Sequence, residues 1–177
     1  WLNNGSTPVS PVEIRQDFLT LASARSIREK QKNFFEAAQG DLQMHTTWSD
    51  GSASIQEMAE AAMGRGYAYI AITDHGKALK IAGGIDEEQL VRQGEEVAEV
   101  NRSTRKRGLR VLRSIELNLT PDGRGDMEEE GLKRLDLVLG CFHSALRRKE
   151  DQTERYLAAL RNPSVDILGH PRGRIYN

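Results

Sequence analysis

The sequence predicts an α/β fold, a barrel of parallel strands and helices with its active site on one rim. Short apolar runs alternate with helical patterns along most of the chain. The four histidines each lie at or just after the end of such a run, and a fifth run ends in a carboxylate; these residues are His45, His75, His143, His170 and Glu116. Ligand-type residues at the C-terminal ends of strands are typical of barrel enzymes. The same pattern therefore suggests a metal site.

Residues 1–39 differ in character from the rest of the chain. They begin as a loop-like stretch and continue as a polar, helix-prone segment without a strand pattern. We interpret them as a linker or the tail of an upstream domain, followed by the barrel domain at 40–177. Five strands are expected in that domain, at about 41–45, 67–73, 109–116, 136–142 and 165–169.

Four helices are expected between these strands. The first begins where Ser54 and Glu57 form a capping box, in which each side chain satisfies a free backbone N–H group of the first turn. The other three are expected near residues 86–108, 127–135 and 150–161. The acidic run at 126–130 is expected to be a solvated helix start.

Parallel strands joined by helices form either a barrel or an open doubly wound sheet, and both bind ligands beyond the strands' C-terminal ends. No Gly-x-Gly-x-x-Gly turn follows the first strand, so the dinucleotide-binding fold loses its main support. The barrel is therefore preferred. Five expected strands fall short of the eight in a full barrel. We expect an atypical barrel, or a chain that is incomplete at its C-terminus.

Composition excludes several classes of function. The 25 basic and 26 acidic residues nearly cancel, so no overall field attracts nucleic acid or membrane, and a nucleic-acid partner would have to bind locally. The single cysteine, Cys141, cannot form an internal disulfide. No apolar stretch approaches the ~20 residues that span a bilayer, and no signal-peptide pattern is present. We expect a soluble, cytoplasmic protein without a membrane partner.

Imidazole and carboxylate groups are the usual ligands of zinc, manganese and iron. A single buried histidine is more often a core residue than a ligand, but four at equivalent strand ends indicate a shared metal site. Asp50 joins the candidates, although Ser-Asp-Gly is also an ordinary turn sequence. Asp74 is expected to orient His75 or to cap a helix. Cys141 is expected to pack as a small apolar residue.

Five segments resemble, in order, the motifs of the polymerase and histidinol phosphatase (PHP) domain family. They are GDLQMHTTWSDG at 40–51, TDH at 73–75, SIEL at 114–117, FHS at 142–144 and GHP at 169–171. Two further segments, KIAGGID at 80–86 and GHPRGR at 169–174, are most similar to the PHP modules attached to bacterial family X DNA polymerases. The resemblance covers residues 40–174.

The resemblance implies a distorted seven-stranded barrel that binds up to three divalent metal ions, manganese, zinc or iron, and hydrolyses phosphate esters. Similar modules of family X polymerases remove nucleotides from DNA 3′ ends, so DNA ends and an adjoining polymerase domain are the expected partners. Three alternatives stay open: a histidinol-phosphatase-like enzyme for small phosphomonoesters, a catalytically weakened interaction module, and a related hydrolase of amides or lactones. The sequence does not indicate an oligomeric state.

The family's pattern assigns the candidate ligands to three sites: Gln43, His45 and Glu116; Asp50 and His75; and Glu116, His143 and His170. His45, Glu116 and His143 are the expected catalytic residues. Gln43 replaces the first histidine of the family's His-x-His, and the family's final Asp-x-His is absent from this sequence. The first two sites therefore lack a ligand each, and the third is expected to be the best occupied. A further segment is expected to complete the barrel.

Three arginines near the motifs are expected to bind the phosphate of the substrate. They are Arg147, Arg172 and Arg174. The guanidinium group of arginine binds phosphate oxygens through two parallel hydrogen bonds, which makes it suitable for this role.

Overall fold

The structure is a computed structural model that describes residues 20–31, 33 and 37–171. The chain divides into two compact units, Trp1–Ala38 and Gln39–Asn177. In the first unit, helix α1 (Leu21–Lys30) begins after Thr20, whose side chain accepts a hydrogen bond from the backbone N–H of Ser23. The second unit holds every other helix and strand described below.

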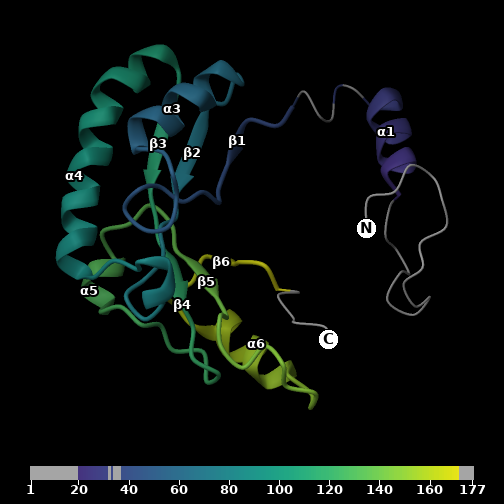
Figure 1. Ribbon diagram of the computed structural model, residues 1–177, viewed down its shortest axis with the longest axis vertical. Coiled ribbons are helices and arrows are strands. Elements are labelled where there is room, and N and C mark those ends of the chain that lie inside the picture. The colour runs from purple at the N-terminus through teal and green to yellow at the C-terminus, as the bar shows by residue number, and fades with distance from the viewer. Residues whose placement is uncertain (1–19, 32, 34–36, 172–177) are drawn as a thin grey trace. The chain divides into compact units, whose positions relative to one another are not determined.

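Two short parallel sheets form the frame of the second unit (Figure 1). One sheet has the order β1-β2-β3 and consists of β1 (Gly40–Asp41), β2 (Tyr69–Ile72) and β3 (Arg110–Arg113). The other has the order β4-β5-β6 and consists of β4 (Glu116–Asn118), β5 (Leu139–Cys141) and β6 (Ile167–Leu168). Each neighbouring pair is parallel. The expected mixed α/β class is confirmed, and the described residues contain these six strands.

The single strand expected at 109–116 is wrong in one respect, because the segment divides between the two sheets. β3 ends at Arg113, and β4 begins at Glu116 in the other sheet. The backbone N–H of Glu116 donates to the carbonyl oxygen of Asp74 at 3.0 Å, and Glu116 also bridges to His75. Ser114 and Ile115 at the break are fully buried, like β4 after them, so the sequence pattern does not show the break.

Two long helices have the beginnings that their sequences predict. Helix α3 (Ile55–Gly64) starts with the capping box of Ser54 and Glu57. Helix α4 (Glu87–Thr104) has a similar box that begins at Asp86. These paired hydrogen bonds satisfy backbone groups that a helix end would otherwise leave free.

The remaining helical segments are short. They are η2 (Lys80–Ala82), η3 (Arg105–Arg107), α5 (Glu129–Leu132) and α6 (Thr153–Arg161). Gly108 ends η3 with φ of 88°, a left-handed conformation that glycine adopts without steric penalty. Within the described ranges, none of the helices combines the length and the apolar character that a membrane span requires.

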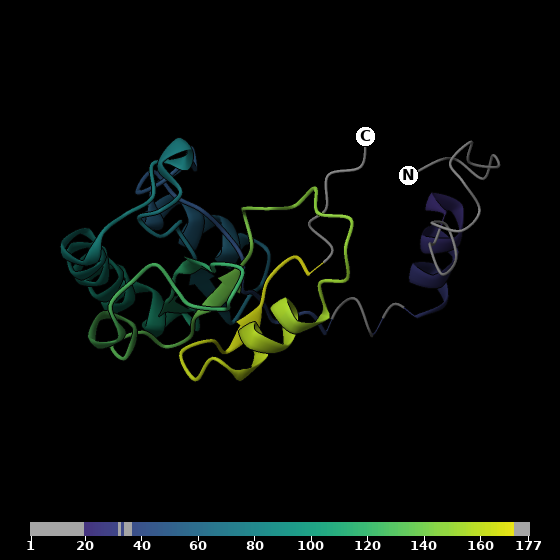
Figure 2. The same ribbon diagram turned by 90° about the horizontal axis from the view of Figure 1, so that it is seen from below.

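Two hydrophobic clusters support the two sheets. The first joins α3 and α4 to the first sheet and includes Ile55, Ile70, Val97 and Val111. The second joins α5 and α6 to the other sheet and includes Leu117, Leu132, Val138 and Ala159. Figure 2 shows α6 beside this second sheet. Each large buried side chain contributes roughly 1.5–3 kcal/mol, so the clusters hold the strand ends in fixed positions.

Candidate metal centre

The carboxylate of Glu116 lies at the centre of the candidate site. It stands at the start of β4, and its side chain is 1% exposed. Its Oε1 lies 2.8 Å from Nε2 of His143 and 3.0 Å from Nε2 of His170. His75 Nδ1 is 3.8 Å from the same oxygen, and His45 Nε2 is 3.4 Å from Oε2. All four histidines of the chain therefore surround one buried carboxylate.

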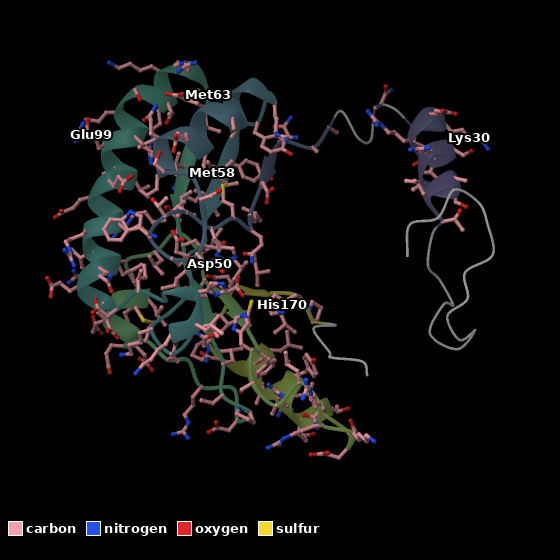
Figure 3. The ribbon with its side chains drawn as sticks, in the orientation of Figure 1. Lys30, Asp50, Met58, Met63, Glu99 and His170 are labelled. Atoms are coloured by element: carbon pink, nitrogen blue, oxygen red, sulfur yellow. The ribbon has the colours of Figure 1, made fainter. Side chains whose placement is uncertain are left out.

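Asp50 extends this cluster towards solvent. Its two carboxylate oxygens lie 4.0 Å from Nδ1 of His45 and 3.7 Å from Nε2 of His75. The rings of these two histidines stack with their centroids 4.3 Å apart. Figure 3 labels Asp50 and His170, which come from opposite ends of the domain's sequence and lie near the same region of the molecule. Both sheets thus supply side chains to one site.

The residues present fit a divalent metal ion. Nδ1 of His45 and Nδ1 of His75 are buried, and neither has a hydrogen-bond partner among the described residues. Each faces a carboxylate oxygen at 3.8–4.0 Å, which is too long for a hydrogen bond. A metal ion between each nitrogen and the carboxylate oxygen that faces it, at about 2.0–2.2 Å from the two atoms, would satisfy that nitrogen.

Three groups of residues could each hold a metal ion, because the possible ligand atoms inside each group lie within 4.8 Å of one another. The groups are His45, Asp50 and His75; His75, Glu116 and His143; and Glu116, Cys141 and His170. This grouping differs from the one expected from the family's pattern. His75 belongs to two groups and connects the two sheets. Cys141 is buried, as expected, but its sulfur also borders the cluster.

The pKa shifts in the cluster follow from burial and hydrogen bonding. Burial alone would raise the pKa of Glu116, but hydrogen bonds from His143, His170 and Gln43 outweigh it and hold the pKa below its usual range. Burial lowers the pKa of His75, which favours the neutral imidazole that binds metals. The hydrogen bond to Glu116 raises the pKa of His170. The centre therefore combines an ionised carboxylate with at least one neutral imidazole.

Asp74 anchors the loop that carries Asp50. Its carboxylate is fully buried and accepts hydrogen bonds from the Thr46 N–H and hydroxyl, both at 2.7 Å, from the Ser49 hydroxyl at 2.6 Å and from Gln93 Nε2 at 2.7 Å. The sequence predicts that Asp74 orients His75 or caps a helix; it does not predict that Asp74 anchors this loop. Asp74 ties the loop after β1 to helix α4 and so holds Asp50 near its histidine neighbours.

Asn118 fixes the orientation of His143. Its Nδ2 donates to the carbonyl oxygen of Gly76 at 3.1 Å and to Asp126 Oδ2 at 2.9 Å. Oδ1 is left to face Nδ1 of His143 at 2.5 Å. Because an amide oxygen only accepts, Nδ1 carries a proton; Nε2 donates to Glu116 while it is protonated and would bind a metal ion through its lone pair once that proton is lost.

Asp126 was expected to belong to a solvated helix start, and it contacts the site region instead. Its carboxylate accepts from the backbone N–H groups of Ala78 and Asn118. Sequence reasoning missed Asn118 itself, although it stands two residues after Glu116. In a strand that spacing places two side chains on the same face, and it could have indicated the contact.

Gln43 turns its amide nitrogen towards the centre. Its Nε2 donates to Glu116 Oε2 at 2.5 Å, while its Oε1 accepts from the hydroxyl of Thr73 at 2.8 Å. An NH₂ group cannot bind a cation. Gln43 could act as a ligand only after its amide turns to present the oxygen.

Of the three expected phosphate-binding arginines, the structure describes only Arg147. Arg147 is exposed, and it forms no ion pair within the described part of the chain. Arg172 and Arg174 lie outside the described residues. The role of all three stays a prediction.

Comparison with protein families finds a match to the PHP domain over residues 41–174. Among curated proteins, the DNA polymerase/3′-5′ exonuclease PolX of Bacillus subtilis (strain 168) is 38% identical over 172 residues, which is 95% of this chain and 29% of that protein. A probable phosphatase of Acetivibrio thermocellus is 38% identical over 136 residues, covering 74% of this chain and 53% of that protein.

A third relative is a probable phosphatase of Thermoanaerobacter sp. (strain X514). It is 33% identical over 143 residues, which is 76% of this chain and 55% of that protein. The chain thus spans less than a third of the polymerase and about half the length of the two phosphatases.

Proposed function

The chain belongs to the PHP domain family, and from this premise we propose that it is a metal-dependent phosphoesterase. The observation that carries the proposal is the convergence of four histidines on the Glu116 carboxylate. Two relatives with the name probable phosphatase and a polymerase with a 3′-5′ exonuclease name support the same class of reaction.

The proposed ligands divide between the two sheets. His45, Asp50 and His75 hold one part of the centre, and Glu116, His143 and His170 hold the other. We propose up to three divalent ions, with manganese, zinc and iron all compatible with these ligands. Such ions, when bound, lower the pKa of water and neutralise phosphate oxygens.

The chain's own residues have distinct proposed roles in the reaction. Glu116 supplies an ionised carboxylate at the middle of the centre, because its hydrogen bonds keep its pKa low. Asn118 holds His143 in one tautomer. His45, Glu116 and His143 are the proposed catalytic residues, and Arg147, Arg172 and Arg174 are proposed to bind the substrate's phosphate.

A hollow of about 190 Å³ beside His143 offers a place for an organic group of the substrate. Its wall includes the apolar side chains of Leu79, Leu119 and Pro121, together with the amide of Asn118. Apolar surface with a few polar groups is typical of sites that bind an organic group. We propose that the sugar and base of a nucleotide at a DNA 3′ end occupy this hollow while the phosphate meets the metal centre.

Two alternatives rest on particular observations. The relatives named probable phosphatase favour a small phosphomonoester. The amide nitrogen of Gln43, which donates to Glu116, favours a module with weakened catalysis. We further propose that a segment beyond the described residues completes a seven-stranded barrel at 40–177, and that residues 1–39 connect it to an adjoining polymerase domain.

The proposal is tested with the full-length protein and added manganese. Release of nucleotides from a 3′-labelled single strand is compared with release of phosphate from histidinol phosphate. Glu116→Gln should lower the rate at least ~100-fold, because it removes the shared charge of the centre. Glu60→Gln, on the exposed side of α3, is the matched control.

Three results would decide between the alternatives. Activity on histidinol phosphate alone would assign the small ester. Loss in both variants would contradict the role of Glu116. Absence of both activities in a protein that binds manganese would favour the weakened module.

A further inference from the structure

We propose that an arginine-lined pocket, separate from the metal centre, binds phosphate groups. The pocket has a volume of about 400 Å³ and lies between α4, β3 and the segment after α5. Four arginines line it: Arg102, Arg105, Arg113 and Arg134. The proposal does not depend on the proposed catalysis, since none of these residues contacts the ligand cluster.

The guanidinium of Arg113 is built into the wall of the pocket. It lies on the helix side of β3, the side on which Val111 packs against Val97 of α4. A Cβ atom at Gly94 would lie 2.6 Å from an NH₂ group of Arg113. Glycine inside a helix is unfavourable compared with alanine. Here it leaves the space that the guanidinium occupies.

The positive charge in the pocket is not balanced within it. Asp136 is the only acidic side chain that lines the pocket, and its oxygens already accept from Arg110 at 2.6 Å and from the backbone N–H of Arg113 at 2.8 Å. In the described part of the chain, no carboxylate lies within 4.0 Å of the Arg105 or Arg113 guanidinium. Nε of Arg113 is buried without a hydrogen-bond partner. A ligand that accepts hydrogen bonds would satisfy it.

A structural role explains only part of this cluster. Arg102 pairs with Glu99, and both Arg102 and Arg105 favourably meet the negative end of the α4 dipole. Arg113 and Arg134 come from other elements, so the dipole does not account for their convergence. The chain as a whole has a net charge of −1, which makes this concentration of arginine a local feature.

Phosphate is the ligand whose chemistry fits. Guanidinium groups bind phosphate oxygens through paired hydrogen bonds, and arginine keeps its charge at any ordinary pH. A phosphate of a nucleic-acid strand and a free phosphorylated compound share this chemistry. The two sources differ in how strongly binding depends on salt, because a strand releases counterions from several phosphates.

The test uses metal-free full-length protein that carries Glu116→Gln, so that the proposed catalysis plays no part. One arm measures binding of a fluorescent single-stranded oligonucleotide at several salt concentrations, and the other titrates inorganic phosphate and follows the Nε–H signal of Arg113 by NMR. The variant Arg105→Ala/Arg134→Ala should weaken binding about tenfold or more and reduce the salt dependence. Arg92→Ala is the control and should bind normally, because Arg92 is exposed on α4, pairs with Glu88 and does not line the pocket.

The outcomes are distinct. Tight, salt-dependent oligonucleotide binding that inorganic phosphate displaces supports the site with a nucleic-acid strand as its source. A phosphate-induced shift at Arg113 without oligonucleotide binding supports it with a free phosphorylated compound. No shift at millimolar phosphate and no oligonucleotide binding would overturn the proposal, as would an equal loss in Arg92→Ala.

Discussion

The two sheets supply the same kinds of side chain to the centre but support them differently. In the first sheet, the fully buried carboxylate of Asp74 organises the ligand loop through four hydrogen bonds. In the second, the neutral amide of Asn118 holds His143. The proposed ligands differ in exposure as well, because the side chain of His75 is 9% exposed and that of His170 is 41% exposed.

This difference indicates that the two halves of the domain, each built on one sheet, depend on their supporting residues for different properties. A buried carboxylate and its donors fix a loop firmly, and loss of one member leaves several buried groups unsatisfied. The neutral amide of Asn118 makes three hydrogen bonds, one of which orients the imidazole ring of His143. Leaving the partners of a neutral amide unsatisfied costs less than leaving those of a buried charge. Changes in the first half should therefore act mainly on stability, and changes in the second mainly on metal affinity.

The largest expected effect is that of Asp74→Ala. It leaves four donors without their acceptor in a buried place, so the free energy of unfolding should fall by about 3 kcal/mol or more. Urea unfolding followed by circular dichroism measures it. Asp122→Ala removes an exposed carboxylate and should change the free energy of unfolding far less. Equal losses in both variants would contradict the structural role given to Asp74.

Asn118→Ala should have a smaller effect on stability and a clear one on metal binding. Without the amide, Nδ1 of His143 loses its acceptor, and metal affinity should fall by roughly 10–100-fold. Calorimetric titration with manganese measures the affinity, and ¹⁵N chemical shifts report the tautomer of His143. Asn162→Ala, whose amide binds the carbonyl of Gly123, is the control. An unchanged tautomer would contradict the role given to Asn118.

The smallest expected effect is a gain. Gln43→His replaces an amide with an imidazole, a better ligand for zinc and manganese, so metal affinity should rise by about tenfold. The same titration measures the change, with Gln56→His on the solvent side of α3 as the control. An affinity that stays constant or falls would show that Gln43 supports the centre through its present hydrogen bonds to Glu116 and Thr73.

Much of the frame could be predicted from local sequence. Ser54 with Glu57 gives the start of α3 because a capping box involves residues only three apart. The convergence of the histidines was also predictable, since the C-terminal ends of parallel strands meet at one edge. The structure brings the histidines and Glu116 together, and their roles in metal binding and catalysis stay predictions.

Other features depend on contacts that local patterns do not encode. The partners of Asp74 include Thr46 and Gln93, which are 28 and 19 residues away in the sequence. The break between β3 and β4 is hidden because Ser114 and Ile115 are fully buried, like Val111 of β3 and all of β4. In the sequence, Arg113 is one polar residue of an expected strand. Only the fold places it in the same pocket as Arg134.

The bridge between His75 and Glu116 joins the two sheets at the centre of the ligand cluster. An ion that binds side chains from both sheets would act as a cross-link between them and would stabilise the folded state according to its concentration and affinity. Without the ion, each sheet with its helices would unfold more independently of the other. The same few side chains would thus determine how cooperatively the domain unfolds.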